Sequence, residues 1–157
     1  MRVGLSGHQH IPAEAFSYVK NGITEIVSNV EGGLVGVSAL AAGADQLFAS
    51  LVLEHGGGLH IIIPCHGYET RFVDPADLER YWRLRGMAER VETLEYPEPS
   101  EDAYLEAGRR VVDISDLLIA VWDGLPAKGK GGTGDVVQYA RSRGVKVEVV
   151  WPAGVVR

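Results

Sequence analysis

The sequence contains a single cysteine, Cys65, in 157 residues. A disulfide framework is therefore excluded, and a reducing, cytoplasmic setting is the natural expectation. Residues 1–5 lack the long apolar core of a signal peptide. No apolar run approaches the ~18 residues that a membrane-spanning helix needs. We therefore expect a soluble protein with no membrane partner.

Basic residues are also scarce. Lysine and arginine together number 15 against 21 aspartates and glutamates, which gives a formal net charge of −6. Non-specific binding to a polyanion depends on dense neutralisation by Lys and Arg, so this balance argues against nucleic acid as a partner. A small anionic ligand remains compatible with it, because local groups of backbone N–H donors can override the overall sign.

Short β-like runs alternate with helix-compatible segments along the whole chain. This alternation predicts one Rossmann-like α/β domain over residues 1–157, with a mainly parallel sheet and helices on both faces. In such domains helices often pair, which favours a homo-oligomer. The expected strands are 3–6, 34–40, 59–63, 91–96, 117–122 and 145–150, and the expected helices are 12–31, 44–55, 75–90, 100–114 and 136–143.

The loops that follow the strands are the candidate ligand-binding segments. In open α/β sheets, ligands bind beyond the carboxyl ends of the strands, where the strand order reverses. Three of the four relevant loops carry a glycine within a few residues of the strand, and together they predict a small, nucleotide-like ligand. The candidate residues are Gly7 and His8; Ser38, Gly43, Ala44 and Asp45; Tyr68 and Glu69; and Asp123, Gly131, Gly132, Thr133 and Gly134.

The glycine-rich stretch 129–135 is the strongest of these signals. It lies between an apolar run, 117–122, and a helix-compatible segment, 136–143. Strand, flexible loop and helix is an arrangement that presents backbone N–H groups to a phosphate, and glycine permits the positive φ angles that such a loop needs. The Thr133 hydroxyl would be an additional donor. The alternative is a loop that only caps the helix.

Each remaining candidate has a functional and a structural interpretation. His8 could contact a phosphate or only shape its loop; a lone His-x-His pair, His8 and His10, is weak evidence for a metal, so we expect neither a metal nor a resident cofactor. Asp45 could bond a ribose hydroxyl or cap the helix that follows. Tyr68 could stack on a base and Glu69 could bond the ribose or act as an acid, or the loop could be packed by its own aromatics.

The segments 6–8, 38–45 and 131–133 occur in the order found in the SLOG superfamily, which the chain resembles over most of its length. That superfamily joins the DNA-processing protein DprA/Smf, the Lonely Guy (LOG) phosphoribohydrolases and the YpsA-like proteins. The short length and the turn 43–45 look most like the YpsA-like branch. The resemblance implies a Rossmann-like fold with a nucleotide pocket formed by these loops. The converging glycine loops and the lack of an obvious acid/base pair favour a ligand sensor without its own chemistry.

The chain departs from the LOG glycine motif, Pro-Gly-Gly-x-Gly-Thr-x-x-Glu, at three positions. Lys130 stands for the proline, Asp135 for the threonine and Gln138 for the glutamate. Glutamine cannot ionise, so LOG-like cleavage of an N-glycosidic bond in a nucleoside monophosphate would need Glu69 or Asp45 instead. That hydrolase is the alternative function, the catalytic residues stay open, and single-stranded DNA binding is a third hypothesis.

Overall fold

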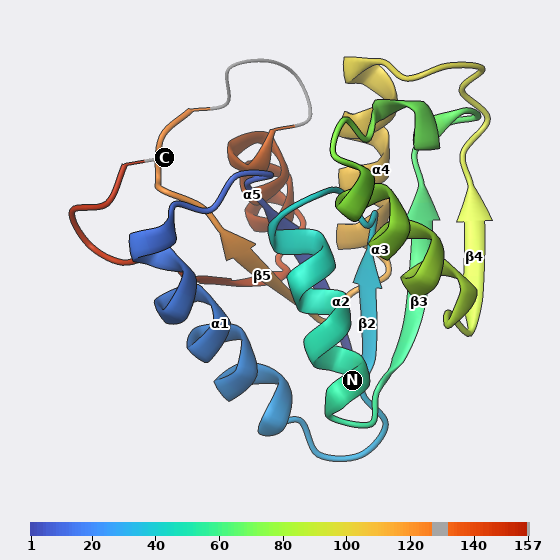
Figure 1. The fold of residues 1–157 in the computed structure, drawn as a ribbon. Coiled ribbons are helices and arrows are strands. Elements are labelled where there is room, and N and C mark those ends of the chain that lie inside the picture. Colours follow the sequence, from blue (N-terminus) through green and yellow to red (C-terminus); the bar gives the residue numbers. More distant parts are fainter. Residues whose placement is uncertain (127–131, 157) are drawn as a thin grey trace.

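A computed structural model describes residues 1–126 and 132–156. One parallel sheet runs through the molecule in the order β4-β3-β2-β1-β5-β6 (Figure 1). The expected Rossmann-like α/β fold is confirmed. The strands are β1 (Arg2–Gly7), β2 (Val35–Ser38), β3 (Gly58–Ile63), β4 (Arg90–Thr93), β5 (Leu117–Val121) and β6 (Lys146–Val149).

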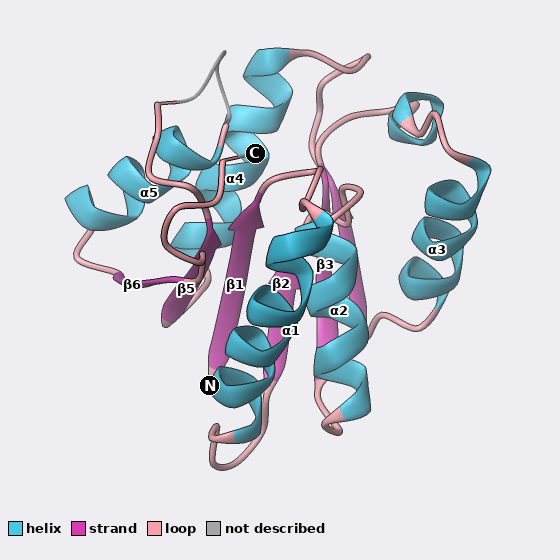
Figure 2. Cartoon of the chain, turned by 60° about the vertical axis from the view of Figure 1, so that its left-hand side comes forward, coloured by secondary structure: helices cyan, strands magenta, loops and turns pink. Residues whose placement is uncertain are grey.

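Helices cover both faces of this sheet, as the alternating pattern predicts. Figures 1 and 2 show α1 and α2 on one face and α4 and α5 on the other. The helices of the described residues are α1 (Ala13–Ser28), α2 (Ala44–Glu54), α3 (Pro75–Gly86), α4 (Glu101–Asp113) and α5 (Thr133–Ser142), with a 3₁₀ turn, η1 (Tyr68–Arg71). None of these helices is both long and apolar enough to cross a membrane.

The strand order reverses between β1 and β5. From β1 the chain builds β2, β3 and β4 outward on one side, and it then crosses back to place β5 on the other side of β1. The last paired residues of these two central strands are Gly7 and Val121. The segments that follow them open onto the position where ligands of such sheets bind.

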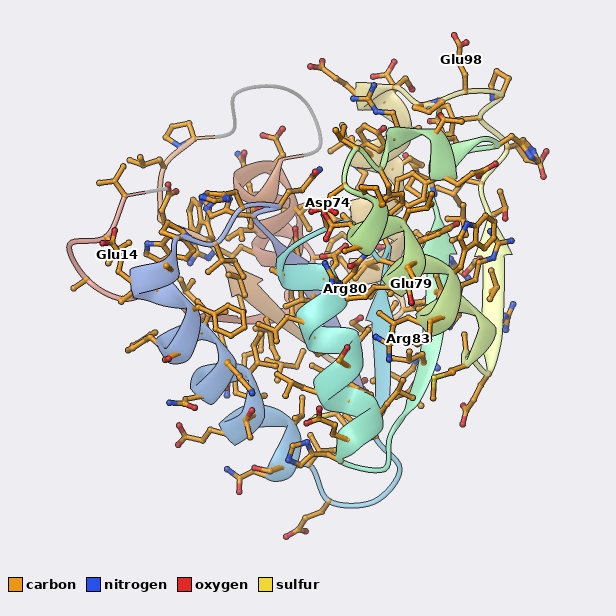
Figure 3. All side chains as sticks on the ribbon, viewed as in Figure 1. Glu14, Asp74, Glu79, Arg80, Arg83 and Glu98 are labelled. Atoms are coloured by element: carbon orange, nitrogen blue, oxygen red, sulfur yellow. The ribbon has the colours of Figure 1, made fainter. Side chains whose placement is uncertain are left out.

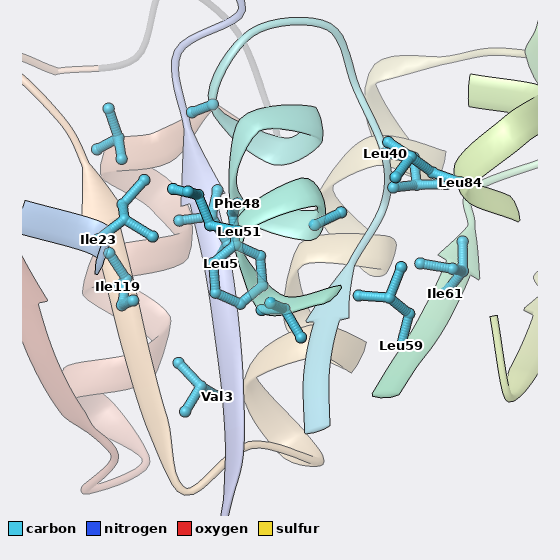
Figure 4. Close-up of a cluster of buried hydrophobic side chains, with 14 of the residues drawn as sticks. Val3, Leu5, Ile23, Leu40, Phe48, Leu51, Leu59, Ile61, Leu84 and Ile119 are labelled. Carbon is cyan, nitrogen blue, oxygen red and sulfur yellow. The ribbon is translucent and has the colours of Figure 1, made fainter. Parts of the chain in front are cut away.

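Two apolar layers fix the sheet between its helices. Toward α1 and α2, Val3 and Leu5 are buried with Phe48 (Figure 4). Toward α4 and α5, Leu118 is buried with Val136. Burying one such side chain fully contributes roughly 1.5–3 kcal/mol. Strands that are apolar on both sides need cover on both sides, which is why the runs 61–63 and 117–121 predict central positions correctly.

The element boundaries differ from the expected ones mainly at the ends of α1 and α3 and at the start of α5. Helix α1 ends at Ser28 rather than at residue 31. Helix α3 starts where Asp74 predicts, with the Asp74 Oδ1 atom accepting from the Ala76 N–H at 2.8 Å. It ends at Gly86 rather than near residue 90, because Arg90 already pairs with His60 of β3 and opens strand β4. Helix α5 starts at Thr133, three residues before the expected Val136.

Candidate ligand site at the carboxyl edge of the sheet

The loops after β1 and β2 meet at the switch point with almost no space between them. A β-carbon on Gly43 would lie 2.2 Å from the carbonyl oxygen of Gln9, and one on Gly7 would lie 2.6 Å from the β-carbon of Ala44. The Ala44 N–H donates to the carbonyl oxygen of His8 at 3.1 Å. Both glycines are therefore required by close approach, and the amino end of α2 is fixed beside the end of β1.

His8 joins the β1 loop to the β5 loop. Its backbone N–H donates to the Val121 carbonyl at 3.1 Å, and its Nε2 atom accepts from the Asp123 N–H at 3.1 Å. An imidazole that accepts at Nε2 carries its proton on Nδ1. The Trp151 ring lies edge-on at 5.2 Å between centroids. The buried His8 side chain thus positions the loop at the switch point, which is the structural interpretation of this residue.

Asp45 is buried in the first turn of α2, but it is not the cap of this helix. The N-cap residue is Gly43, so the capping interpretation of Asp45 is wrong. Its Oδ2 atom instead accepts from the Ala41 N–H at 3.1 Å, and so ties the preceding loop to the helix. Burial raises the pKa of Asp45 to about 7, against the opposing effect of hydrogen bonds from the backbone of Ala41 and Ala39. This carboxyl group therefore changes charge near neutral pH.

The loop between β2 and α2 contains a residue that the sequence does not single out. Leu40 is buried and has a φ of 56°, a conformation that costs a non-glycine residue free energy. The Ser38 Oγ atom accepts from the Leu40 N–H at 3.0 Å. A positive φ is uncommon in a non-glycine residue unless neighbouring contacts hold it. Here Ser38 bonds the Leu40 N–H and Asp45 bonds the N–H of the next residue, Ala41.

Gln46 is a second residue that sequence reasoning missed. Its Nε2 atom donates to the carbonyl oxygens of Leu40 and Asp77, at 3.3 and 3.0 Å. Its Oε1 atom accepts from Arg80 Nε at 3.1 Å, and Figure 3 shows Arg80 on α3 beside α2. This single side chain connects the strained loop, α2 and α3. The one available signal was a polar residue directly before the apolar positions of a helix.

Tyr68 packs among other aromatic rings instead of presenting a face to solvent. It is buried on η1, with ring centroids of Phe72, Tyr81 and Tyr104 at 5.5, 5.6 and 6.3 Å. Burial, and next the nearby Asp45 carboxyl, raise the pKa of Tyr68 well above its ordinary value. This geometry agrees with the interpretation of the loop as packed by its own aromatics, whereas Glu69 beside it is half-buried.

The β5 loop and the start of α5 complete the edge. The Asp123 Oδ1 atom accepts from the Leu125 N–H at 3.0 Å. Gly132 is the N-cap of α5, and Thr133 and Gly134 form its first turn, with Thr133 buried. Gly131, like Lys130, lies outside the described residues. The amino ends of α2 and α5 thus both point their first-turn N–H groups toward the carboxyl side of the sheet.

The charges of the site are mixed. Helix amino ends favour an anion, but Asp45 and Asp135 lie in the first turns of α2 and α5. Such an edge suits a ligand with both an anionic group and hydroxyl donors. Across residues 1–126 and 132–156, no group of His, Cys, Asp and Glu is arranged to hold a metal ion.

No protein-family profile and no curated protein matches the sequence. Solved structures do match the fold. DprA from Streptococcus pneumoniae aligns with a TM-score of 0.70 and 20% identity over 94% of this chain and 49% of its own. DprA from Helicobacter pylori, studied for its single-stranded DNA binding mode, aligns with a TM-score of 0.70 and 18% identity, over 95% of this chain and 64% of its own. The protein TM1055 aligns with a TM-score of 0.59 and 13% identity, over 93% of this chain and 71% of its own.

These likenesses show the fold that the SLOG resemblance implies, and the YpsA-like branch stays a prediction. The chain spans about half of the S. pneumoniae DprA (49%) and 64% of the H. pylori DprA. The argument against nucleic acid as a partner is wrong, because the H. pylori protein binds single-stranded DNA and has this fold. A net charge of −6 describes the whole chain, whereas binding depends on one local surface.

Proposed function

We propose that the carboxyl edge of the sheet, at the β1–β5 switch point, binds a nucleotide or a nucleotide-derived ligand, and that the protein acts as a ligand sensor of the YpsA-like type. The observation that carries this proposal is the contact of the loops at Gly7, His8 and Gly43, which is tight enough to exclude any β-carbon on either glycine. Because the glycines let the two loops lie together, the amino end of α2 is held at the switch point, where its N–H groups would meet a phosphate or a ribose.

The roles follow from the groups that each segment presents. The N–H groups at the start of α2 and α5, with the Thr133 hydroxyl, would hold the anionic end of the ligand. Asp45 and Glu69 would accept from ribose hydroxyls. Gln138 is exposed on α5 and cannot ionise, which favours binding without hydrolysis of the N-glycosidic bond.

Thermal shift and calorimetry with AMP, ADP, NAD, ADP-ribose and cyclic dinucleotides test this proposal. A true ligand raises Tm in proportion to the logarithm of its concentration above Kd. Gly43→Ala should abolish this shift and Gly32→Ala should keep it, because a β-carbon on Gly32 meets nothing within 4 Å. If none of these ligands shifts Tm or gives a binding heat at millimolar concentration, the proposal is refuted. If the protein releases free base from a nucleoside monophosphate, and Glu69→Gln loses this activity, the protein acts as a hydrolase and not as a sensor.

Single-stranded DNA is a second candidate ligand. The supporting observation is the fold shared with the H. pylori DprA over 95% of this chain. Fluorescence anisotropy with a labelled oligothymidylate at low salt measures it, and a polyanion site would lose affinity steeply as salt rises. Competition separates the two candidates: a mononucleotide that displaces the oligonucleotide uses the same edge, and one that does not uses another surface.

A further inference from the structure

A groove of about 890 Å³ lies between α1 and the edge strand β6, away from the switch-point loops. Figure 2 shows β6 at the opposite edge of the sheet from α3, with α1 on the near face. Tyr18 and Glu25 line the groove from α1, and Glu148 and Val149 line it from β6. Among the apolar lining residues, Tyr18 and Val149 are open to solvent, at 54% and 46% exposure.

One side of this groove is formed by β6, the last strand of the sheet. Within the described chain, β6 pairs only with β5. The Val150 N–H donates to the Ala120 carbonyl at 2.8 Å. Because backbone groups alternate sides along a strand, those of Val147 and Val149 then point outward, away from β5. Such unpaired N–H and C=O groups are a template for another strand.

The charge around the groove is predominantly negative. Glu25, Glu31, Asp116 and Glu148 contribute carboxylates to its lining. Among the described residues that line it, Lys146 is the only Lys or Arg, and it pairs with Glu148 at 3.3 Å. The Met1 amino group donates to the Gly33 carbonyl at 2.7 Å. The surplus of carboxylates selects a partner that carries positive charge.

We propose that this groove binds an extended segment of a partner protein in which basic and apolar residues alternate, added to the sheet as a strand beside β6. Main-chain bonds to Val147 and Val149 would hold the segment. In an added strand, side chains alternate between the two faces. One set would meet the carboxylates of the groove, such as Glu25 on α1 and Glu148 on β6, and the other would lie beside the exposed Val149. Nucleic acid is repelled by those carboxylates, and the oligomeric state of the protein in solution distinguishes a partner protein from a second copy of this chain.

A short acetylated, fluorescein-labelled peptide of alternating lysine and valine is the probe, with fluorescence polarisation as the readout. Val149→Pro removes an outward N–H, which proline can lack on an edge strand without unfolding it, and should weaken binding about tenfold. Glu148→Gln should weaken it less and reduce its salt dependence. Val91→Pro is the matched control, since residue 91 lies on the other edge strand, β4, and should change nothing.

Nucleotide binding at the switch point should be the same in Val149→Pro as in the unmodified protein, so the groove and the switch-point site are tested separately. The inference fails if millimolar peptide gives no polarisation change, if a glutamate–valine peptide binds equally well, or if Val149→Pro and Val91→Pro behave alike. It also fails if sedimentation shows a dimer that Val149→Pro dissociates, because a second copy would then occupy the edge.

Discussion

Gly43 lies against the backbone of Gln9, so that a β-carbon at residue 43 would stand 2.2 Å from the Gln9 carbonyl oxygen. Gly43 also has a φ of +81°, a conformation that L side chains rarely adopt. The contact joins the first two loops of the carboxyl edge at the start of α2. The packing of the β1 loop against the start of α2 therefore requires that residue 43 has no β-carbon.

We expect Gly43→Ala to destabilise the protein by roughly 3 kcal/mol, the sum of backbone strain and a forced shift of the β1 loop. Gly32→Ala separates the two causes, because Gly32 has nearly the same φ, +80°, and open space around it. That control should cost about 1 kcal/mol. Urea unfolding monitored by circular dichroism measures both. Equal losses in the two variants would show that the approach to Gln9 has no energetic consequence.

The sequence predicts the elements of this fold well because its local signals agree with one another. Apolar runs at 61–63 and 117–121 need burial on two sides, and Asp74 marks the start of α3, whereas α1 already ends at Ser28, before Gly32-Gly33. The parallel sheet follows from the alternation of strands and helices. Strand β4 was less predictable: with only Arg90–Thr93 paired to β3, its register depends on a neighbour distant in sequence.

The meeting of the candidate loops at the carboxyl edge of the sheet was predictable, whereas the contacts of their side chains were less so. Glycines that end strands indicate close approach, and Gly7 and Gly43 do lie together. The partners of Asp45 and Gln46, and the positive φ of Leu40, depend on how a loop folds back on its own helix. No pattern of residue types encodes that geometry.

Replacing His8 by alanine should loosen the β5 loop more than it destabilises the whole protein. The variant loses the acceptor of the Asp123 N–H and leaves space beside Trp151. We expect a loss of roughly 1–3 kcal/mol in unfolding free energy and faster hydrogen exchange at the Asp123 amide. His10→Ala, at an exposed position in the same loop, is the control. Unchanged exchange at Asp123 in His8→Ala would contradict the positioning role.

Asp45 makes stability depend on pH across the neutral range. Its pKa is raised from 3.8 to about 7 by burial, so the folded state binds more protons than the unfolded state between those values. Stability must then fall as pH rises from about 4 to 7 and level off above. Asp45→Asn removes this titration while keeping an acceptor for the Ala41 N–H.

We expect Asp45→Asn to gain on the order of 1–3 kcal/mol over the unmodified protein when pH is raised from 5 to 8. Urea unfolding of both proteins at the two pH values is the measurement. Glu54 is an exposed residue at the end of the same helix, and Glu54→Gln should show the same change of unfolding free energy with pH as the unmodified protein. A difference of the opposite sign would mean that the folded protein stabilises the charged form of Asp45.

Gln46→Ala should uncouple α3 from the loop that precedes α2. The change removes three hydrogen bonds in one step and leaves the Leu40 and Asp77 carbonyls and the Arg80 guanidinium without this partner. A buried carbonyl that loses its donor costs about 1–3 kcal/mol, so we expect a loss of roughly 3 kcal/mol. Gln138→Ala, exposed on α5, should stay within about 0.5 kcal/mol. Gln46→Ala should also change the local protection of the loop. Because Leu40 is held in a strained conformation, proteolysis within residues 39–43 should accelerate in this variant. If the variant is destabilised while this segment stays protected, Gln46 supports only the packing of α3, and Ser38 and Asp45 hold the strained loop.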